Sequence, residues 1–226
     1  MIDFALTSLE QSQLITAILE TTYLLLISAL ISIPIGSLIG FILALYGKNK
    51  VYAQGYLSSI LSVIMSIIRS IPFVLLMVLI IPLSYNLFKT SIGVIPSLIS
   101  LSIIGIATVS RLVEQAITDI NPQIFDLAKS MGATKYQLFR HFIFVEARSS
   151  LILGYTSALV SLLAYSSVVY IVGGGGLGYT AIQIGYYSPV GKTLMWVSTI
   201  LMILLVQIIQ LIGNLIANYL NKKKRG

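Results

Sequence analysis

Residues 21–46 read TTYLLLISALISIPIGSLIGFILALY and contain no charged side chain. As an α-helix rising about 1.5 Å per residue, a run of this length exceeds the roughly 30 Å hydrocarbon core of a bilayer. The whole chain has the same character, because 57% of its 226 residues are hydrophobic and only 9% are charged, against about 25% in soluble domains. We therefore predict an integral membrane protein whose length leaves no room for a sizeable soluble catalytic domain.

Apolar stretches of membrane-spanning length recur along the chain. They cover residues 21–46, 55–87, 94–117, 150–172 and 193–219. The second is interrupted near Arg69 and Pro72, but a helix that ended at Arg69 would be only about 22 Å long. We therefore interpret residues 55–87 as one long pass, bent where Pro72 removes a backbone hydrogen bond. The expected fold is an all-α membrane protein, with a single domain of five transmembrane helices over residues 1–226.

Cations between the spans predict the orientation of the chain. If the N-terminus is outside, the inner segments hold ten cations: Lys48, Lys50, Lys129, Lys135, Arg140, Arg148, Lys222, Lys223, Lys224 and Arg225. The outer segments hold Lys89 and Lys192. Since Lys and Arg concentrate on the cytoplasmic side, we expect the N-terminus outside and the C-terminus inside. This distribution does not indicate a nucleic-acid partner, and the absence of cysteine excludes disulfides and cysteine metal sites.

The polar segment 118–149, between the third and fourth predicted spans, carries helix signals. Asn121-Pro122 is typical of a helix start, with an N-cap residue followed by proline at the first helical position. One apolar stripe follows at helical spacing, made by Ile124, Leu127, Ala128 and Met131. Gly132 then suits the left-handed residue that ends many helices.

A second short helix is predicted after Gly132. Thr134 and Gln137 match a capping box, and the apolar residues that follow again share one side: Leu138, Phe139, Phe142 and Val145. The segment is thus expected to form two amphipathic helices hinged at Gly132. Such helices either lie against lipid headgroups or dock in a groove of a soluble partner, and periodicity does not separate the two.

A resemblance to the EAA loop of ABC-importer permeases is carried by residues 126–134, DLAKSMGAT, with Gln137, Arg140, Glu146 and Ala147. In that family the loop forms the coupling helix that inserts into the ATPase subunit. The resemblance implies an ATPase-coupling role for Asp126, Leu127, Ala128, Met131, Gly132, Ala133, Thr134 and Gln137. The chain departs from the family pattern at Asp126, Leu127 and Val145, where glutamate, alanine and proline are usual. The change at Val145 bears on where the second loop helix ends.

Further matches extend the resemblance over essentially the whole chain: RSIPF at 69–73, TSIG at 90–93, GGLG at 175–178 and Tyr186. With these the chain is similar to methionine-importer permeases. That family implies import of L- or D-methionine through a homodimer of this subunit in a bacterial cytoplasmic (inner) membrane. It also implies two copies of a soluble ATPase that holds ATP and magnesium, and an extracytoplasmic substrate-binding protein. The chain itself is expected to hold no cofactor or metal and to catalyse no reaction.

Candidate pathway and gate residues include groups at membrane depth and the glycine-rich turn. Charged residues inside a membrane are functional by default, and the fourth span is rich in small and hydroxyl residues. The full set is Arg69, Pro72, Tyr165, Ser166, Ser167, Gly175, Gly176 and Gly178. Two alternatives stay open: the fourth span packs against another helix, and the glycines form a flexible outer turn. Arg111 and Glu114, three residues apart, are expected to pair on one helix face.

Other motifs and function classes fit less well. Gly173, Gly175 and Gly178 satisfy G-x-G-x-x-G, but a membrane span precedes them in place of the strand of a dinucleotide site. The sequence GKT at 191–193 lacks the upstream glycine of a P-loop. An ABC permease for another amino acid or small polar solute is the nearest alternative function. A secondary carrier is another, although the chain shows no internal repeat and no chain of buried acids.

Overall fold

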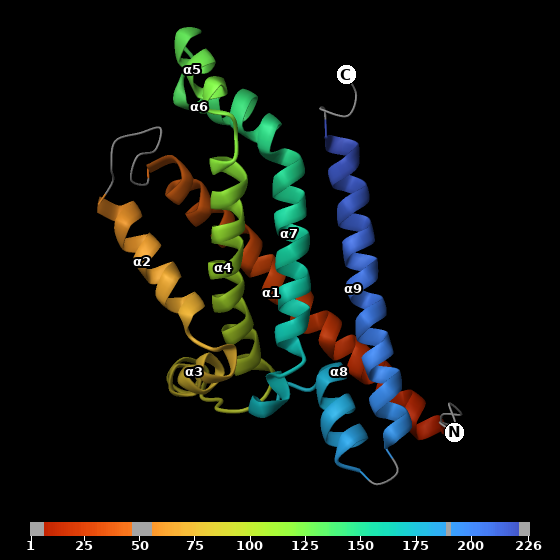
Figure 1. Cartoon of the computed structure of the whole chain (residues 1–226). Helices are drawn as coiled ribbons and strands as arrows, with labels where there is room; N and C mark the ends of the chain where they lie inside the picture. Colours follow the sequence, from red (N-terminus) through yellow and green to blue (C-terminus); the bar gives the residue numbers. More distant parts are fainter. Residues whose placement is uncertain (1–6, 47–55, 189–190, 222–226) are drawn as a thin grey trace.

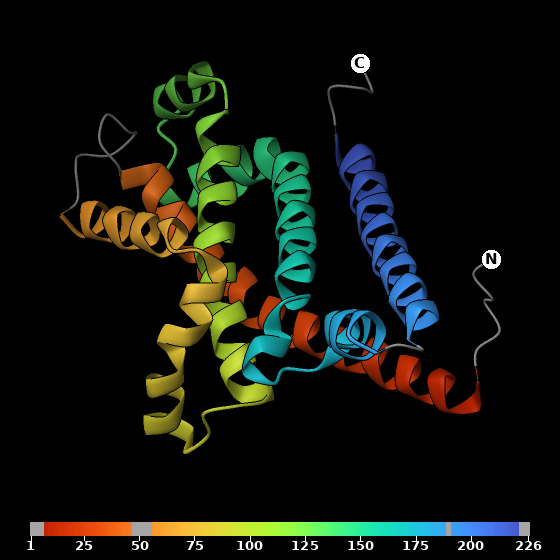
Figure 2. The same cartoon turned by 60° about the horizontal axis from the view of Figure 1, so that its bottom comes forward.

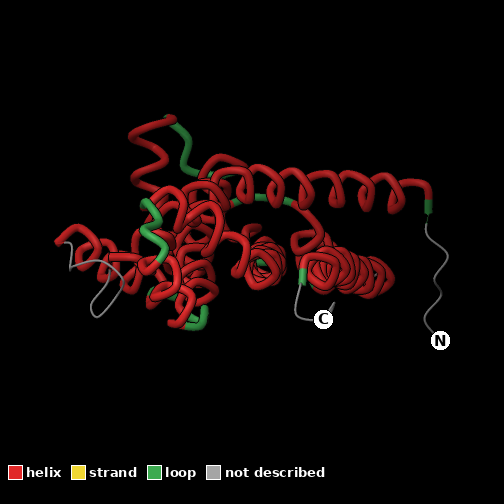
Figure 3. The backbone as a smooth tube through the Cα atoms, turned by 90° about the horizontal axis from the view of Figure 1, so that it is seen from above, coloured by secondary structure: helices red, strands yellow, loops and turns green. Residues whose placement is uncertain are grey.

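The computed structural model describes residues 7–46, 56–188 and 191–221. Every regular element within these ranges is helical (Figure 3). The π-helical turns are labelled η1 and η3, and the 3-10 helix is labelled η2. In chain order the elements are α1 (Ser8–Tyr46), α2 (Tyr56–Ser70), α3 (Phe73–Phe88), α4 (Val94–Thr118), α5 (Pro122–Ser130), α6 (Lys135–Gln137), η1 (Leu138–Ile143), α7 (Phe144–Ser166), η2 (Val169–Val172), α8 (Gly176–Tyr179), η3 (Thr180–Tyr186) and α9 (Lys192–Leu220).

Four helical stretches in the described part of the chain are each long and apolar enough to cross a bilayer: α1, α4, Leu138–Ser166 and α9. Helices α2 and α3 pass the same test only as a pair, and they meet at 111°. The break falls at Pro72, which has no backbone N–H, and at Ile71, which the following proline keeps out of the helical region. We expected one long, bent pass over residues 55–87, but the bend is so sharp that α3 leads away from the end of α2 at a steep angle (Figure 2).

Helix α1 is longer than the first predicted span and begins at Ser8. Its start is fixed by Thr7, whose backbone N–H and hydroxyl both donate to Glu10 Oε2 at 2.8 Å. The polar residues of this first part lower the local hydropathy, but they do not prevent helix formation. The resulting 39-residue helix runs obliquely past α4 and α7 (Figures 1 and 3).

The second predicted loop helix does not end before the fourth span. Instead α6, η1 and α7 follow one another without a break from Lys135 to Ser166. The Phe144 N–H donates to Phe139 O within the π-helical turn. Val145 keeps the N–H that a proline would lack, so nothing interrupts the hydrogen-bond ladder there. The helix of the fourth span therefore begins before residue 150, and the last predicted residues form the separate turn η2.

The packing of α1 against α4 depends on glycines. A Cβ on Gly36 would lie 2.7 Å from Cβ of Val109, and a Cβ on Gly40 would lie 2.7 Å from Cβ of Val113. Real side chains do not approach so closely, so glycine allows the two backbones to come together. A third close contact brings Gly105 of α4 against the Ser32 side chain of α1.

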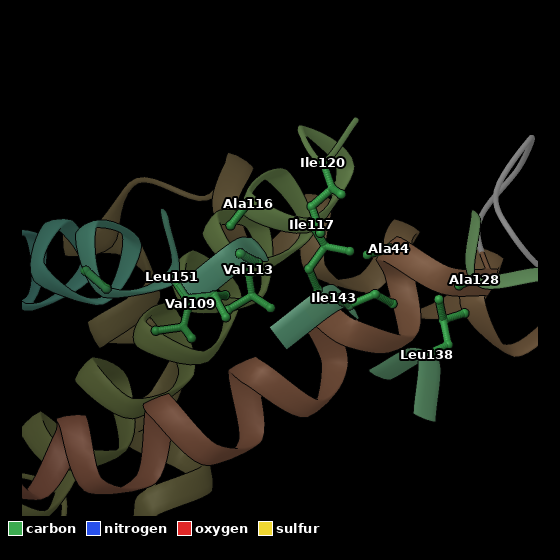
Figure 4. Packing of buried hydrophobic residues seen from close by; sticks show 12 residues of the cluster. Ala44, Val109, Val113, Ala116, Ile117, Ile120, Ala128, Leu138, Ile143 and Leu151 are labelled. Carbon is green, nitrogen blue, oxygen red and sulfur yellow. The ribbon is translucent and has the colours of Figure 1, made fainter. Parts of the chain in front are cut away.

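Buried apolar residues form two main clusters at different heights along this helix pair. The first joins α1, α4, the loop segment and α7 (Figure 4): Ala44, Val109, Val113, Ala116, Ile117, Ile120, Ala128, Leu138, Ile143, Ala147, Leu151 and Ala158. The second joins α1, α3, α4, α7 and η2: Leu24, Ala29, Phe73, Leu76, Met77, Ile80, Leu101, Ile104, Leu162, Val169 and Val172. The loop between α4 and α7 is therefore part of the packed body of the protein.

Helix α9 contributes little to these clusters. Its buried residues are Leu194, Ser198, Gly213 and Ala217, and most of its large apolar side chains are exposed. It packs on α7, where Gly213 meets the Thr156 side chain. Its remaining apolar surface suits lipid tails or another membrane helix.

We predict that Gly40→Ala destabilises the protein. The added Cβ would lie 2.7 Å from Cβ of Val113 and 2.6 Å from Ser110 O, and overpacking of this kind costs about 1–3 kcal/mol. Gly154→Ala is the matched control, because its Cβ would lie 3.4 Å from Cβ of Leu112, an ordinary contact. Melting midpoints in detergent should fall for Gly40→Ala and hold or rise for Gly154→Ala. Equal midpoints for the two variants would contradict the proposed packing.

Candidate functional site

Helix α5 has a defined beginning and end. Asn121 Oδ1 accepts the Gln123 N–H at 3.0 Å, and Pro122 occupies the first helical position. At the other end Gly132 adopts φ +66°, a left-handed conformation that glycine takes without strain. The Ala133 N–H then donates to Ala128 O at 3.0 Å, the long-range bond of a Schellman motif. These bonds fix the length of α5 at its nine residues.

The turn after Gly132 is held by a reciprocal pair of hydrogen bonds. The Thr134 N–H donates to Gln137 Oε1 at 2.8 Å, and the Gln137 N–H donates to Thr134 Oγ1 at 3.3 Å. This is the geometry of a capping box, and it starts the helix that continues into α7. The loop therefore has the helix start and stop that its sequence indicates, although its second helix has no end of its own.

The apolar stripe predicted on α5 divides into two faces. Ala128 is only 1% exposed and belongs to the first buried cluster, and Ile124 packs against that cluster. Leu127 and Met131 lie on the other side and are 55% and 68% exposed. Asp126, which lies between Ile124 and Leu127 in the sequence, is also exposed. One side of α5 is thus anchored to the protein, and the other presents large apolar side chains outward.

Arg69 lies at the end of α2, just before the break. Its Nη1 donates to the backbone carbonyl of Ala107 on α4 at 3.2 Å, while the residue as a whole stays exposed. Pro72 is exposed beside it. Further along α4, Arg111 Nη1 and Glu114 Oε2 are 3.3 Å apart and form the expected ion pair. This side of α2 and α4 thus carries charge on an otherwise apolar surface.

Tyr165, Ser166 and Ser167 lie at the end of α7 but do not share one environment. The Tyr165 ring packs against Phe73 of α3 at 4.7 Å between centroids. Ser166 is buried and its hydroxyl donates to Leu163 O at 2.7 Å, which leaves it no route to solute in this conformation. The half-buried Ser167 donates to Ala164 O at 2.7 Å.

The small residues of α7 pack against other helices in part. Ala158 is 1% exposed within the first cluster, and Gly154 approaches Leu112 of α4. Ser157 and Ala164 remain exposed. The packing interpretation therefore holds for one side of α7, and the exposed side stays available for the pathway or for a second copy.

The glycine-rich turn is held in place by α1. Gly173, Gly175 and Gly176 all have positive φ, which glycine adopts readily. The Gly176 N–H donates to Glu20 Oε2 at 2.7 Å, and the Leu177 N–H donates to Thr21 Oγ1 at 2.8 Å. A flexible turn does not agree with these bonds.

Sequence reasoning missed Glu20 and Thr21 as partners of the turn. They lie 156 residues from the groups they bind, so no local pattern links them. The only available signal was an isolated carboxylate, Glu20, directly before an uncharged span. Gly176 and Gly178 are buried at this turn, and Gly175 is half-buried.

The segment of α5 and α6 and the glycine-rich turn lie at opposite ends of the molecule. Helices α5 and α6 lie at one end with the C-terminal end of α9, and η2 and α8 lie at the other end (Figure 1). No cluster of three or more His, Cys, Asp or Glu residues in the described part of the chain could hold a metal ion. The arrangement thus offers an outward docking surface at one end and a fixed turn at the other.

Similar proteins have been named as methionine transport components. The chain is 35% identical over 202 residues to the "Probable D-methionine transport system permease protein MetI" of Haemophilus influenzae, covering 89% of this chain and 94% of that protein. It is 31% identical to the "Methionine import system permease protein MetP" of Bacillus subtilis, covering 80% of this chain and 82% of that protein. A solved structure of the "MetNI methionine ABC transporter" in an inward-facing conformation superposes with a TM-score of 0.90 at 29% identity, covering 96% of this chain and all of that one.

A family model matches residues 33–226, from the middle of α1 through α9 to the last residue. The match includes α5 with its glycine stop and the glycine-rich turn. The chain belongs to the family described as the inner membrane component of binding-protein-dependent transport systems.

Proposed function

We propose that this chain is the permease subunit of an ABC importer that carries methionine into a bacterial cell, with the L- and D-enantiomers as candidate substrates. The names of relatives at 31–35% identity and the likeness to the methionine transporter structure support this proposal. The chain supplies the membrane pathway, and ATP with magnesium would be held by a separate ATPase subunit. Two copies of that ATPase, a second copy of this chain and an extracytoplasmic binding protein would complete the transporter.

The observation that carries the proposal is the two-faced helix α5. Ala128 and Ile124 fix it to the body of the protein, and Leu127 and Met131 face outward. A helix that presents an apolar edge from a fixed base suits docking in a groove of a soluble partner. Because Ala128 shares a buried cluster with Ala44 of α1, motion of the docked helix would reach the spans directly.

We propose that α5 faces the cytoplasm. The concentration of cations in the segments on its side supports this orientation. Figure 1 supports it as well, because α5 and the C-terminal end of α9 lie at the same end of the molecule, away from the N-terminal end of α1. Under this orientation η2 and α8 lie at the outer side, where the binding protein would deliver solute.

We propose that Arg69 faces a water-filled pathway between two copies of this chain. A charged side chain exposed to lipid at membrane depth is costly, so its exposure on one subunit argues for a polar neighbour in the assembly. Pro72, Tyr165, Ser167 and Gly175 are exposed or half-buried and are retained as pathway or gate candidates. Three other candidates are buried and would be reached only after rearrangement: Ser166, Gly176 and Gly178.

We predict that Gly132→Asp preserves membrane insertion and abolishes uptake. No atom lies within 4 Å of a Cβ built on Gly132, so the side chain fits within the subunit. The new charge would instead disturb docking to the ATPase. Gly132→Asn is the control, since asparagine has the same shape, tolerates φ above zero and adds no charge. Methionine uptake at matched protein levels should be lost with Asp and largely kept with Asn; wild-type uptake with Asp contradicts the assignment of the loop.

We predict that Met131→Ala weakens assembly with the ATPase without destabilising the subunit. Met131 is 68% exposed, so truncation leaves no cavity in the free chain, while loss of an interface anchor costs more than about 1 kcal/mol. The ATPase that co-purifies should fall severalfold, with an unchanged melting midpoint. Ala128→Leu is the contrasting variant, because Ala128 is 1% exposed and a larger side chain should lower the midpoint. Full co-purification with Met131→Ala would rule out this contact.

We predict that Arg69→Gln lowers methionine uptake by roughly tenfold or more, while Arg69→Lys restores part of it. The control is Lys192→Gln, which removes an exposed cation at the start of α9 and should not change uptake. Uptake is measured in liposomes containing the complete transporter. Equal rates for Arg69→Gln and wild type would remove Arg69 from the pathway.

Two experiments separate the remaining alternatives. Excess unlabelled methionine should abolish uptake of labelled methionine, and failure to compete would indicate another amino acid or small polar solute. Deletion of the ATPase should stop uptake, whereas a secondary carrier would continue to transport.

A further inference from the structure

The glycine-rich turn at the outer end is held by two consecutive side chains of α1. The Glu20 carboxylate and the Thr21 hydroxyl accept the Gly176 and Leu177 N–H groups at 2.7 and 2.8 Å. These N–H groups belong to the first residues of α8, where a helix has no partners of its own for its backbone donors. Side chains normally supply such caps from the residues next to the helix. Here a distant span supplies both, so the start of α8 is bonded to α1.

The same turn leaves no space for side chains. A Cβ on Gly175 would overlap the Glu20 carboxyl group, and a Cβ on Gly176 would lie 2.7 Å from Thr21 Oγ1. Thr21 is 2% exposed and Leu177 is fully buried. The hydrogen bonds are therefore surrounded by close contacts. A hydrogen bond that a carboxylate accepts from an N–H group is also stronger than one between neutral groups.

Other spans meet the turn from the remaining sides. A Cβ on Gly174 would overlap the Ser97 hydroxyl of α4, and one on Gly178 would overlap the Ser167 backbone that follows α7. The Gly93 N–H before α4 also donates to Val172 O of η2 at 2.6 Å. The position of the start of α8 is thus set by the first half of α1 and by the ends of α4 and α7, while η3 packs on α9, where a Cβ on Gly185 would lie 2.6 Å from Met195 N.

A continuous packed route joins this turn to the coupling loop. Ala128 of α5 shares a cluster with Ala44 of α1 and Val113 of α4. The glycine contacts at Gly36 and Gly40 then hold α1 against α4 along its length. Glu20 and Thr21 lie nearer the opposite end of the same helix. These two residues bond the turn directly to α1, so they pass a displacement of α1 to it.

We propose that Glu20 and Thr21 are positioning residues for transport, and we call the pair the α1 clamp. The clamp stays closed through the transport cycle, so that the start of α8 moves with α1 when the coupling loop moves. This inference rests on the proposed ATP-driven function, because it assigns the clamp a role in passing that motion to the outer side. It involves no contact between the clamp and the solute.

Uptake of labelled methionine by the complete transporter in liposomes is the first test, with ATP hydrolysis measured in parallel. Glu20→Ala should lower uptake by roughly tenfold or more, as expected for loss of a charge-assisted hydrogen bond, and ATP hydrolysis should persist. Glu20→Gln keeps an acceptor oxygen and should recover uptake to within a fewfold of wild type. Glu10→Ala is the matched control, since Glu10 is a carboxylate on the same helix whose partner among the described residues is Thr7.

A second readout needs no transported solute. Natural cysteine is absent, so Thr180→Cys provides a single thiol at a residue that is 2% exposed, one turn after the clamped N–H groups. A membrane-impermeant maleimide should label it slowly in the otherwise wild-type transporter, both without nucleotide and when trapped with ATP and vanadate. Glu20→Ala, combined with Thr180→Cys, should raise the labelling rate by roughly tenfold or more. Glu20→Gln in the same background should not raise it.

Several outcomes would overturn the clamp. Labelling that rises on trapping with ATP and vanadate would show that the contact opens during the cycle. Wild-type labelling and uptake in Glu20→Ala would show that it is dispensable. If Glu20→Ala does not assemble, Thr21→Val removes the hydroxyl with little change of shape and should lower uptake severalfold; wild-type behaviour in Thr21→Val then overturns the proposal. A wild-type transporter that hydrolyses ATP without taking up methionine contradicts the proposed substrate alone, and the labelling still tests the clamp.

Discussion

The close approach of α1 and α4 is the contact on which the rest of the structure depends. Gly36 and Gly40 allow the α1 backbone to reach Val109 and Val113 of α4, where any side chain would collide. In a bilayer, lipid tails solvate apolar side chains as well as a neighbouring helix does, so shape and backbone proximity decide which helices associate. Both buried clusters draw residues from α1 and α4, and α3, α7 and the loop between α4 and α7 are arranged around this pair.

This arrangement connects the two ends of the protein through packed and hydrogen-bonded residues. Helix α5 is joined to the helix pair through Ala128, and the glycine-rich turn is joined to α1 through Glu20 and Thr21. Packed helices are poorly compressible, so a displacement at one end is carried to the other and is not absorbed between them. The capping box at Thr134 has the same effect, because it makes the second part of the loop continuous with α7.

Features with a local physical cause could be predicted from the sequence, and features set by distant contacts could not. The helix start at Asn121, the stop at Gly132 and the break at Pro72 each follow from bonds or sterics within a few residues. The 111° angle between α2 and α3, the burial of Ser166 and the role of Glu20 depend on which helices meet. The outward direction of Leu127 belongs to the second group, since periodicity placed it on one stripe with the buried Ala128.

Polar contacts are needed to fix which face of the apolar helix α1 meets each of its neighbours. Its apolar residues lie all around it, so hydrophobicity alone does not select the face that meets α4. Small polar groups act with Gly36 and Gly40 in that selection: Ser32 Oγ donates to Ser102 O of α4 at 3.2 Å, and on another side of α1 Ser37 Oγ lies 2.9 Å from the Tyr155 hydroxyl of α7. Turning α1 would break these bonds in a medium that offers no water to replace them. Glu20 and Thr21 bond the same helix to the glycine-rich turn, so polar residues that fix the rotation of α1 also fix the turn that it carries.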